Sequence, residues 1–286
     1  MADRKRSFGF FTFGLAFVLV IALLATGCTQ SPSGSGTTPV QTLKVTGSTT
    51  VLPIAQAAGE AYMNTHAEAD IQVSGGGSSV GVQAVGEGTA DVGMSSRDLK
   101  SEEKTRFPDL VTTVIGNDGI AVIVHPSNTV STLSLEQVRA IYLGTCTNWK
   151  ELGGPDSAIV VIGRDSASGT REFFTEKVME KQNTLPGMLE KNSNGAVRQT
   201  VAQTPGAVGY VGLGYIDNDV RAIGLNVNGE AVQPTVQNVL DGKYPVSRPL
   251  LMLTQGAPQG LAKDYIEFIK SKEGQAIVVD EGYVPL

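Results

Sequence analysis

The chain has 286 residues, a formal net charge of −6, two cysteines and two histidines. The negative charge argues against a nucleic-acid partner, because nucleic-acid-binding proteins present a basic face to the phosphate backbone. The cysteines and histidines form no cluster with metal-ligand spacing, so the sequence predicts neither a metal site nor a cofactor.

The N-terminus has the pattern of a secretory signal. Basic residues 4–6 precede an apolar run from Phe8 to Leu24, and Gly27-Cys28 follows. This pattern predicts a signal peptide over residues 1–28 with lipidation at Cys28, and an uncleaved membrane anchor is the alternative. Both interpretations place the rest of the chain outside the cytoplasm, on the outer face of the cytoplasmic membrane. A lipidated Cys28 would leave Cys146 alone, and we interpret Cys146 as a passive small residue.

Residues 29–42 are uncharged and rich in serine, threonine, proline and glycine, which predicts a flexible tether. From Leu43 onward, hydrophobic spacing predicts strands alternating with helices. The first group consists of strands at 43–46, 71–73, 90–94, 111–115 and 120–124, helices at 51–64 and 80–86, and a turn at 116–119.

The alternation repeats after about residue 128. This second group consists of a helix at 135–142 with Ser134 as N-cap, a strand at 159–162, a helix at 170–181, strands at 207–213 and 250–253, and helices at 261–270 and 274–279. Such alternation is typical of the α/β class. It predicts two lobes, each a mainly parallel sheet flanked by helices, with a ligand cleft between them.

Three segments rich in serine, threonine and glycine stand where a predicted strand meets a helix: 46–50, 75–79 and 164–170. Each offers backbone N–H groups, hydroxyl donors and the positive end of a helix dipole. A serine or threonine at one such place is commonly only a helix cap. Three of them converging would make a site for a dehydrated anion.

These segments resemble the phosphate-binding proteins of ABC phosphate importers, the receptors of the Pst system. The resemblance covers most of 43–286 and extends to the motifs at 91–97, 147–149, 206–210 and 244–250. It implies a periplasmic-binding-protein fold, similar to type II. Lobe one would comprise residues 43–127 plus 222–286, and lobe two residues 128–221.

The resemblance also implies a function: extracytoplasmic, high-affinity binding of inorganic phosphate by a monomer that delivers it to the permease and ATPase subunits of an ABC importer. The implied phosphate ligands are Ser48, Thr49, Thr50, Ser78, Ser96, Arg164, Ser168, Gly169 and Thr170.

Ser96 stands where many members of this family have an aspartate that accepts a proton from the bound phosphate. The acceptor here could be Asp91, Asp165 or Ser96 itself. Asp91 could instead be a turn or cap acid, and Asp165 a structural partner of Arg164. Arg97 is either a second positive group of the site or part of a surface salt bridge.

Other functions compete with this interpretation. The same fold could bind sulfate, molybdate, tungstate or a phosphonate, or it could serve a sensory lipoprotein without transport. Gly77-Ser78-Ser79-Val80-Gly81 matches the nucleophile-elbow pattern of hydrolases, with His125 as the base. However, His125 stands beside Pro126 at the end of an apolar strand, and the sequence favours a protein that is not an enzyme.

Overall fold

The computed structural model describes residues 39–286. The predicted signal peptide, the predicted lipidation site at Cys28 and most of the predicted tether lie outside these residues. The first strand begins at Gln41 and so includes the last two residues of the predicted tether.

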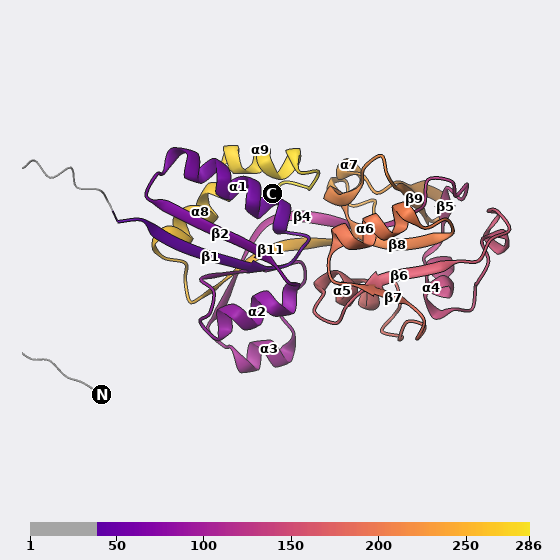
Figure 1. The fold of residues 1–286 in the computed structure, drawn as a ribbon, viewed down its shortest axis with the longest axis horizontal. Coiled ribbons are helices and arrows are strands. Elements are labelled where there is room, and N and C mark those ends of the chain that lie inside the picture. The colour runs from indigo at the N-terminus through magenta and orange to yellow at the C-terminus, as the bar shows by residue number, and fades with distance from the viewer. Residues whose placement is uncertain (1–38) are drawn as a thin grey trace, which may run out of the picture. The chain divides into compact units, whose positions relative to one another are not determined.

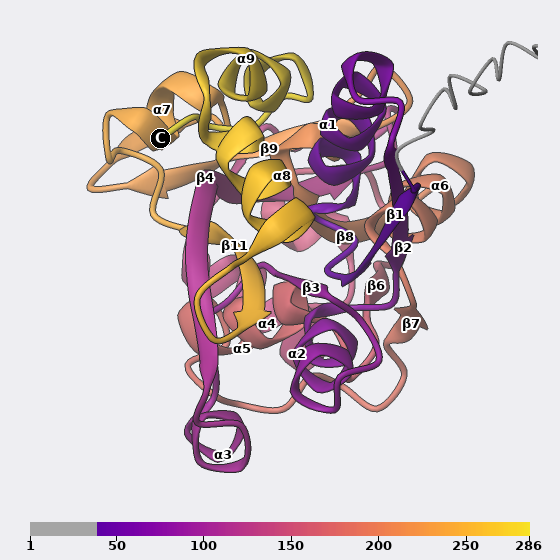
Figure 2. The same ribbon diagram turned by 90° about the vertical axis from the view of Figure 1, so that its left-hand side faces the viewer.

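One lobe is built on a core that includes Val45, Ile54, Ile71, Val92 and Tyr265. In Figures 1 and 2, its helices α1, α8 and α9 lie on one side of β1–β3, and α2 lies on the other. Its elements are β1 (Gln41–Gly47), α1 (Leu52–Thr65), β2 (Ala69–Gly75), α2 (Ser78–Gly86), β3 (Val92–Ser95), α3 (Ser101–Arg106), β11 (Ser247–Gln255), α8 (Gly260–Lys270) and α9 (Lys272–Asp280).

The other lobe surrounds a core that includes Val138, Tyr142, Trp149, Phe174 and Tyr210. Its elements are β5 (Thr132–Leu133), α4 (Leu135–Leu143), η1 (Trp149–Leu152), β6 (Val160–Arg164), α5 (Gly169–Lys177), β7 (Leu189–Lys191), α6 (Asn194–Gln203), β8 (Ala207–Gly212), η2 (Leu213–Tyr215), β9 (Arg221–Val227), β10 (Glu230–Val232) and α7 (Val236–Leu240).

The sheet is mixed and continuous. Its strand order is β2-β1-β3-β11-β4-β8-β6-β7, where β4 spans Leu110–Val124. The outer pairs β1–β2, β1–β3, β6–β7 and β6–β8 are parallel, whereas β4 and β11 run antiparallel to their neighbours in this order. The carboxyl ends of the parallel strands therefore face helix starts, as predicted for both lobes.

Helix α4 shows how local sequence sets an element. Ser134 accepts a hydrogen bond from the Gln137 backbone N–H, and the Gln137 side chain accepts one from the Ser134 N–H. This reciprocal capping box begins the helix, and Gly144 ends it in the left-handed region at φ 77°. The predicted N-cap is confirmed.

Two predictions about elements were wrong. The turn expected at 116–119 is part of β4, which is a single strand. The helix expected over 170–181 ends at Lys177, and Glu180 and Lys181 follow in the left-handed region.

Two segments pass from one core to the other. On β4, Ile115 packs in the core around Val45, whereas Ile120 packs in the core around Tyr210. The chain returns between Val246, which belongs to the second core, and Leu250, which belongs to the first. Figure 1 shows β4 and β11 running between the two groups of elements. The predicted lobe limits at 127 and 222 stay a prediction.

Candidate functional site

The segment between β1 and α1 carries Ser48, Thr49 and Thr50, and all three side chains are buried. None of them caps α1, whose N-cap is Val51. The Ser48 hydroxyl accepts from the Thr50 N–H at 3.2 Å and donates to the Ser96 Oγ at 3.0 Å. The simple cap interpretation therefore fails for this segment.

Ser78 is the first residue of α2, and its side chain is fully buried. Its Oγ accepts from the backbone N–H of Ser96 at 3.1 Å and lies 3.4 Å from the Ser96 Oγ. Ser96 follows β3, so β3 brings it beside the start of α2. Gly77, just before α2, needs to be glycine, because its φ is +101° and a Cβ there would lie 2.5 Å from the Ala167 carbonyl oxygen.

The segment from β6 to α5 carries Arg164, Ser168, Gly169 and Thr170, all buried. Ser168 caps α5 by accepting from the Arg171 N–H at 3.1 Å. The Arg164 guanidinium donates to the carbonyls of Lys191 at 3.1 Å and Asn192 at 3.2 Å. Backbone carbonyls from the chain after β7 thus fix the orientation of this arginine.

The predicted segments from the two lobes meet. The hydroxyl oxygens of Thr50 and Thr170 lie 3.0 Å apart, and Gly169 packs against Ser78 so closely that a Cβ would lie 2.8 Å from the Ser78 Cβ. The Ser79 N–H donates to the Ala167 carbonyl at 3.2 Å. The structure therefore brings the predicted segments of the two lobes together at one buried junction, through their hydroxyl residues and Gly169.

Arg164 is a buried cation that makes no ion pair among the described residues. Within residues 39–286, no carboxylate lies at ion-pair distance from its guanidinium. Burial lowers the pKa of Arg164 from its ordinary value; the Asp165 charge opposes this shift, and the neighbouring Arg248 charge adds to it. A buried, unpaired guanidinium is unfavourable unless an anion joins it.

Sequence reasoning missed Asn194, the first residue of α6. Its fully buried amide Nδ2 donates to the hydroxyls of Thr49 at 3.1 Å and Thr50 at 3.0 Å. Ser193-Asn194-Gly195 follows a strand and opens a helix, which is the pattern that identified the other three segments. The pattern could have found it.

Sequence reasoning also assigned no role to Arg248, although the motif at 244–250 carried part of the resemblance. Arg248 and Asp118 form a fully buried ion pair at 2.8 Å. Burial raises the pKa of Asp118, against the lowering effects of Arg248 and of the N–H groups of Leu213 and Gly119. Arg248 also contacts the hydroxyls of Thr50 and Thr170.

The alternative proton acceptors are now distinguishable. Asp91 is exposed and accepts from the Lys44 N–H of β1 at 2.7 Å, so it makes a structural contact between strands and not that of a local turn or cap acid. Asp165 follows Arg164, and its Oδ1 is buried with no hydrogen-bond partner among the described residues. The structure therefore leaves Asp165 and Ser96 as candidate acceptors.

Arg97 forms a salt bridge, but a buried one. It pairs with Glu103 at 2.7 Å and with Glu172 of α5, and Lys100 also reaches Glu172 at 2.7 Å. Because Arg97 and Glu172 belong to different lobes, this cluster joins the lobes beside the site.

The hydrolase pattern is not assembled. The Ser79 hydroxyl accepts from Arg97 at 3.1 Å, whereas His125 is hydrogen-bonded to Ser127 at 2.7 Å. Neither residue contacts the other in residues 39–286, so the structure shows no serine–histidine dyad there.

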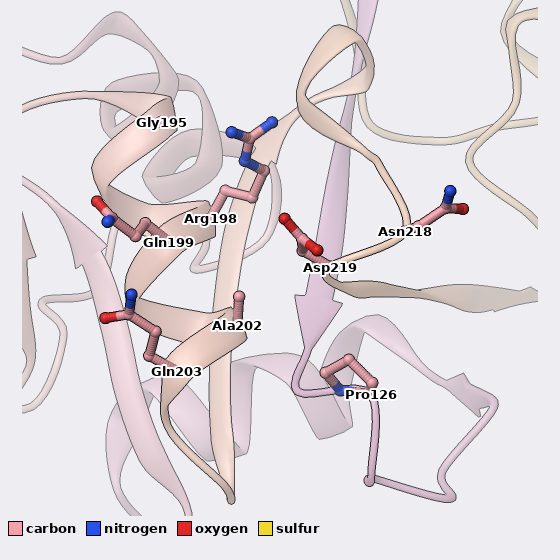
Figure 3. A pocket seen from close by; sticks show the side chains of 8 residues that line it. All are labelled: Pro126, Gly195, Arg198, Gln199, Ala202, Gln203, Asn218 and Asp219. Carbon is pink, nitrogen blue, oxygen red and sulfur yellow. The ribbon is translucent and has the colours of Figure 1, made fainter.

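Figure 3 shows a surface pocket along α6 that is separate from this junction. Arg198, its cationic residue, already pairs with Asp217 at 2.8 Å, so we assign it no ligand. It is lined by Pro126, Gly195, Arg198, Gln199, Ala202, Gln203, Asn218 and Asp219. In the described part of the chain no group of three or more histidine, cysteine or acidic residues could hold a metal, and no helix could cross a membrane.

Comparison with known proteins agrees with this geometry. Residues 32–273 match the PBP superfamily domain. The chain is 35% identical to the phosphate-binding protein PstS of Bacillus subtilis, over 85% of this chain and 80% of that protein. It is 32% identical to PstS of Pseudomonas aeruginosa, over 85% and 83%.

Solved structures share the fold. A protein of Clostridium perfringens, solved with bound phosphate, is 38% identical with a TM-score of 0.80, over 86% of this chain and all of that one. An ABC-type phosphate transport receptor of Vibrio cholerae is 33% identical with a TM-score of 0.69, over 85% of this chain and all of that one. The two-lobed α/β fold is thereby confirmed, and the chain belongs to the PstS family of substrate-binding proteins within the PBP superfamily.

Proposed function

We propose that this protein binds inorganic phosphate outside the cytoplasm and delivers it to the permease and ATPase subunits of an ABC importer. The carrying observation is Arg164, a buried guanidinium with no carboxylate at ion-pair distance among the described residues. It begins the segment whose Thr170 meets Thr50 of the other lobe. PstS relatives at 32–35% identity carry the name of phosphate-binding proteins, which supports the same ligand here.

The proposed ligand shell consists of the hydroxyls and N–H groups at three helix starts together with Ser96, which follows β3, and Arg164. Arginine can pair with a tetrahedral anion through two parallel N–H groups. Each charge-assisted hydrogen bond contributes about 1.5–3 kcal/mol net, so several of them correspond to a micromolar or tighter Kd, about −8 kcal/mol or better. The proposed ligands are Ser48, Thr49, Thr50, Ser78, Ser96, Arg164, Ser168, Gly169 and Thr170.

Anchoring is part of this proposal. A monomer held at the outer face of the cytoplasmic membrane, through lipid on Cys28 or through the N-terminal apolar run, would stay close to its permease. The buried state of Cys146 supports its interpretation as a passive residue, and that burial raises the pKa of its thiol.

Ser96 makes an oxyanion other than phosphate a second candidate ligand. A buried carboxylate at this place would repel sulfate, which has no proton to donate, and a serine hydroxyl does not. Sulfate, molybdate, tungstate and a phosphonate are therefore the competing ligands to test.

The test uses full-length protein purified in detergent and calorimetric titration with phosphate and with sulfate. We expect phosphate to bind at micromolar concentration or below, and sulfate only at millimolar concentration. Phosphate at one hundred times its Kd should stabilise the protein by about 2.7 kcal/mol. Tighter binding of sulfate than of phosphate would contradict the proposal.

Arg164→Ala should weaken phosphate binding by at least about a hundredfold, because a charge-assisted bidentate contact is lost. Arg198→Ala is the matched control, since Arg198 pairs with Asp217 at the surface of α6. Phosphate uptake by cells carrying Arg164→Ala should fall together with binding. Normal uptake without binding would instead indicate a sensory lipoprotein.

A further inference from the structure

Arg248 occupies a special place in the fold. It lies directly opposite Asp118 in the antiparallel pairing of β11 with β4. Both residues are therefore on the two segments that pass from one core to the other. The exposed fraction of both side chains is 0%, so the pair is shielded from water.

The edge of the Arg248 guanidinium that carries Nε and Nη2 is bound by Asp118. Its Nε and Nη2 donate to the Asp118 Oδ2 at 3.0 Å and 2.8 Å. One Nη2 hydrogen goes to Asp118, so the other is shared in a three-centre hydrogen bond between the Thr170 Oγ1 at 3.0 Å and the Thr50 Oγ1 at 3.2 Å. Arg248 thus joins the connecting strands to one hydroxyl from each lobe.

These contacts determine where two hydroxyl protons point. The Thr50 Oγ1 receives hydrogen bonds from Arg248 Nη2 and from Asn194 Nδ2, and both of these groups can only donate. With its lone pairs occupied, Thr50 must donate its own proton, and the Thr170 Oγ1 lies 3.0 Å away. Thr170 then accepts from both Thr50 and Arg248, so its proton must point elsewhere.

Asn194 fixes the neighbouring hydroxyl in the same way. The backbone N–H of Gly212 donates to the Asn194 Oδ1 at 3.3 Å, so the amide nitrogen faces the threonines. The Thr49 Oγ1 accepts from the Asn194 Nδ2 at 3.1 Å and from its N–H at 3.4 Å. Thr49 is thereby left with a proton to donate as well.

We propose that Arg248, oriented by Asp118, is a positioning residue that turns the Thr170 hydroxyl into an obligatory donor toward the bound anion. This inference rests on the proposed phosphate function and names a specificity rule for it. The ligand oxygen beside Thr170 must accept a hydrogen bond, and a ligand O–H pointing at Thr170 would find no acceptor, because both lone pairs of the Thr170 Oγ1 are occupied. Asn194 sets the same rule at Thr49.

The test is a double-mutant cycle on phosphate affinity in full-length protein. Arg248→Met alone would strand the buried Asp118 charge, so the pair is replaced together as D118N/R248M, and T170V removes the hydroxyl. We expect each change to raise the phosphate Kd about tenfold or more. The combination D118N/R248M/T170V should bind almost as D118N/R248M does, because Thr170 has already lost its imposed orientation.

R198M, at the surface of α6, is the control and should leave the Kd unchanged with or without T170V. R248K provides a second measurement in a variant that keeps the charge but loses the planar fork, and it should show the same coupling to T170V. Melting temperatures without phosphate show whether each variant is folded.

Fold-changes that multiply in the triple variant and in R248K/T170V would mean that Arg248 acts only on the structure, and the inference would be overturned. An unchanged Kd in D118N/R248M would overturn it too, while leaving the phosphate function intact. Failure of the unaltered protein to bind phosphate would instead remove the proposed function and, with it, this inference.

Discussion

Gly169 shows how a single position controls contact between the lobes. A Cβ at this residue would overlap the Ser78 Oγ and lie 2.8 Å from the Ser78 Cβ. Gly169 belongs to α5 and Ser78 to α2. Because glycine has no side chain, α2 of the other lobe can approach α5 closely at this position. The glycine in the predicted Ser-Gly-Thr motif therefore has a steric reason.

We expect Gly169→Ala to raise the phosphate Kd about tenfold or more. Overpacking costs about 1–3 kcal/mol, and this cost would destabilise mainly the form in which the two lobes are in contact. Gly187→Ala is the control, since its Cβ would meet only Leu185 at 3.8 Å. Calorimetric titration of both variants checks this. Equal affinities for the two would show that α5 and α2 need not approach so closely.

Residue motifs predicted much of the site. Ser48, Ser78 and Thr170 were found because hydroxyl residues at helix starts follow a recognisable local pattern. Their three segments meet, since Ser48 and Ser78 both contact the Ser96 Oγ and Thr50 contacts Thr170. Their role as phosphate ligands stays a prediction. Arg248 could not be assigned a role from the sequence, because its partner Asp118 is 130 residues away and only strand pairing brings them together.

At the scale of elements, α3 and α5 are joined by charge. Arg97 and Lys100, before α3, both reach Glu172 on α5, while Glu103 holds Arg97 from the other side. Glu172 is partly exposed at 23%, so salt can weaken its attraction to the two cations. This cluster joins the lobes directly beside the proposed ligand shell, where Arg97 follows Ser96 and packs against Gly169.

Glu172→Gln should therefore weaken phosphate binding about threefold to tenfold at low salt, and the difference from the unaltered protein should shrink as salt is added. Glu190→Gln is the control, because Glu190 pairs with Arg171 within one lobe. Phosphate titrations at several sodium chloride concentrations provide the measurement. A Kd difference that does not change with salt would argue against an electrostatic role.

The strand β4 explains why one element was mispredicted. Gly116-Asn117-Asp118-Gly119 has the composition of a turn, but tertiary pairing keeps it extended. β11 pairs with it through a bulge at Ile115, and Asn117 exchanges backbone hydrogen bonds with Val284 at 2.7 Å and 3.0 Å. Local sequence cannot report partners that lie more than 130 residues away, whereas the regular spacing of α4 and α8 was sufficient to predict them.

At the scale of the whole described region, several kinds of contact between the lobes are present together in one structure. The hydroxyl contacts, the Ser79–Ala167 backbone bond, the Glu172 cluster and the Tyr215 hydroxyl on the Thr49 carbonyl at 2.6 Å all join them. This is the arrangement expected when an anion is enclosed. It also means that the ligand must enter before these contacts form.

We expect removal of phosphate to separate the lobes, because the charge of Arg164 then favours hydration over burial. X-ray scattering of phosphate-free and phosphate-saturated protein should give a larger radius of gyration for the free form. Arg164→Ala supplies the comparison, since its curve should no longer respond to phosphate. Identical curves for the unaltered protein in both conditions would rule out a hinge motion of this kind.

The connection through β4 and β11 limits what that motion can be. These two strands are hydrogen-bonded to each other along the whole crossing, including the Asp118–Arg248 position. A paired ribbon resists stretching and sliding but twists readily. Opening would then be a torsion about this ribbon, and the lobes would close along the same path each time. Arg248, which lies in the ribbon, would keep its orientation against Asp118 throughout.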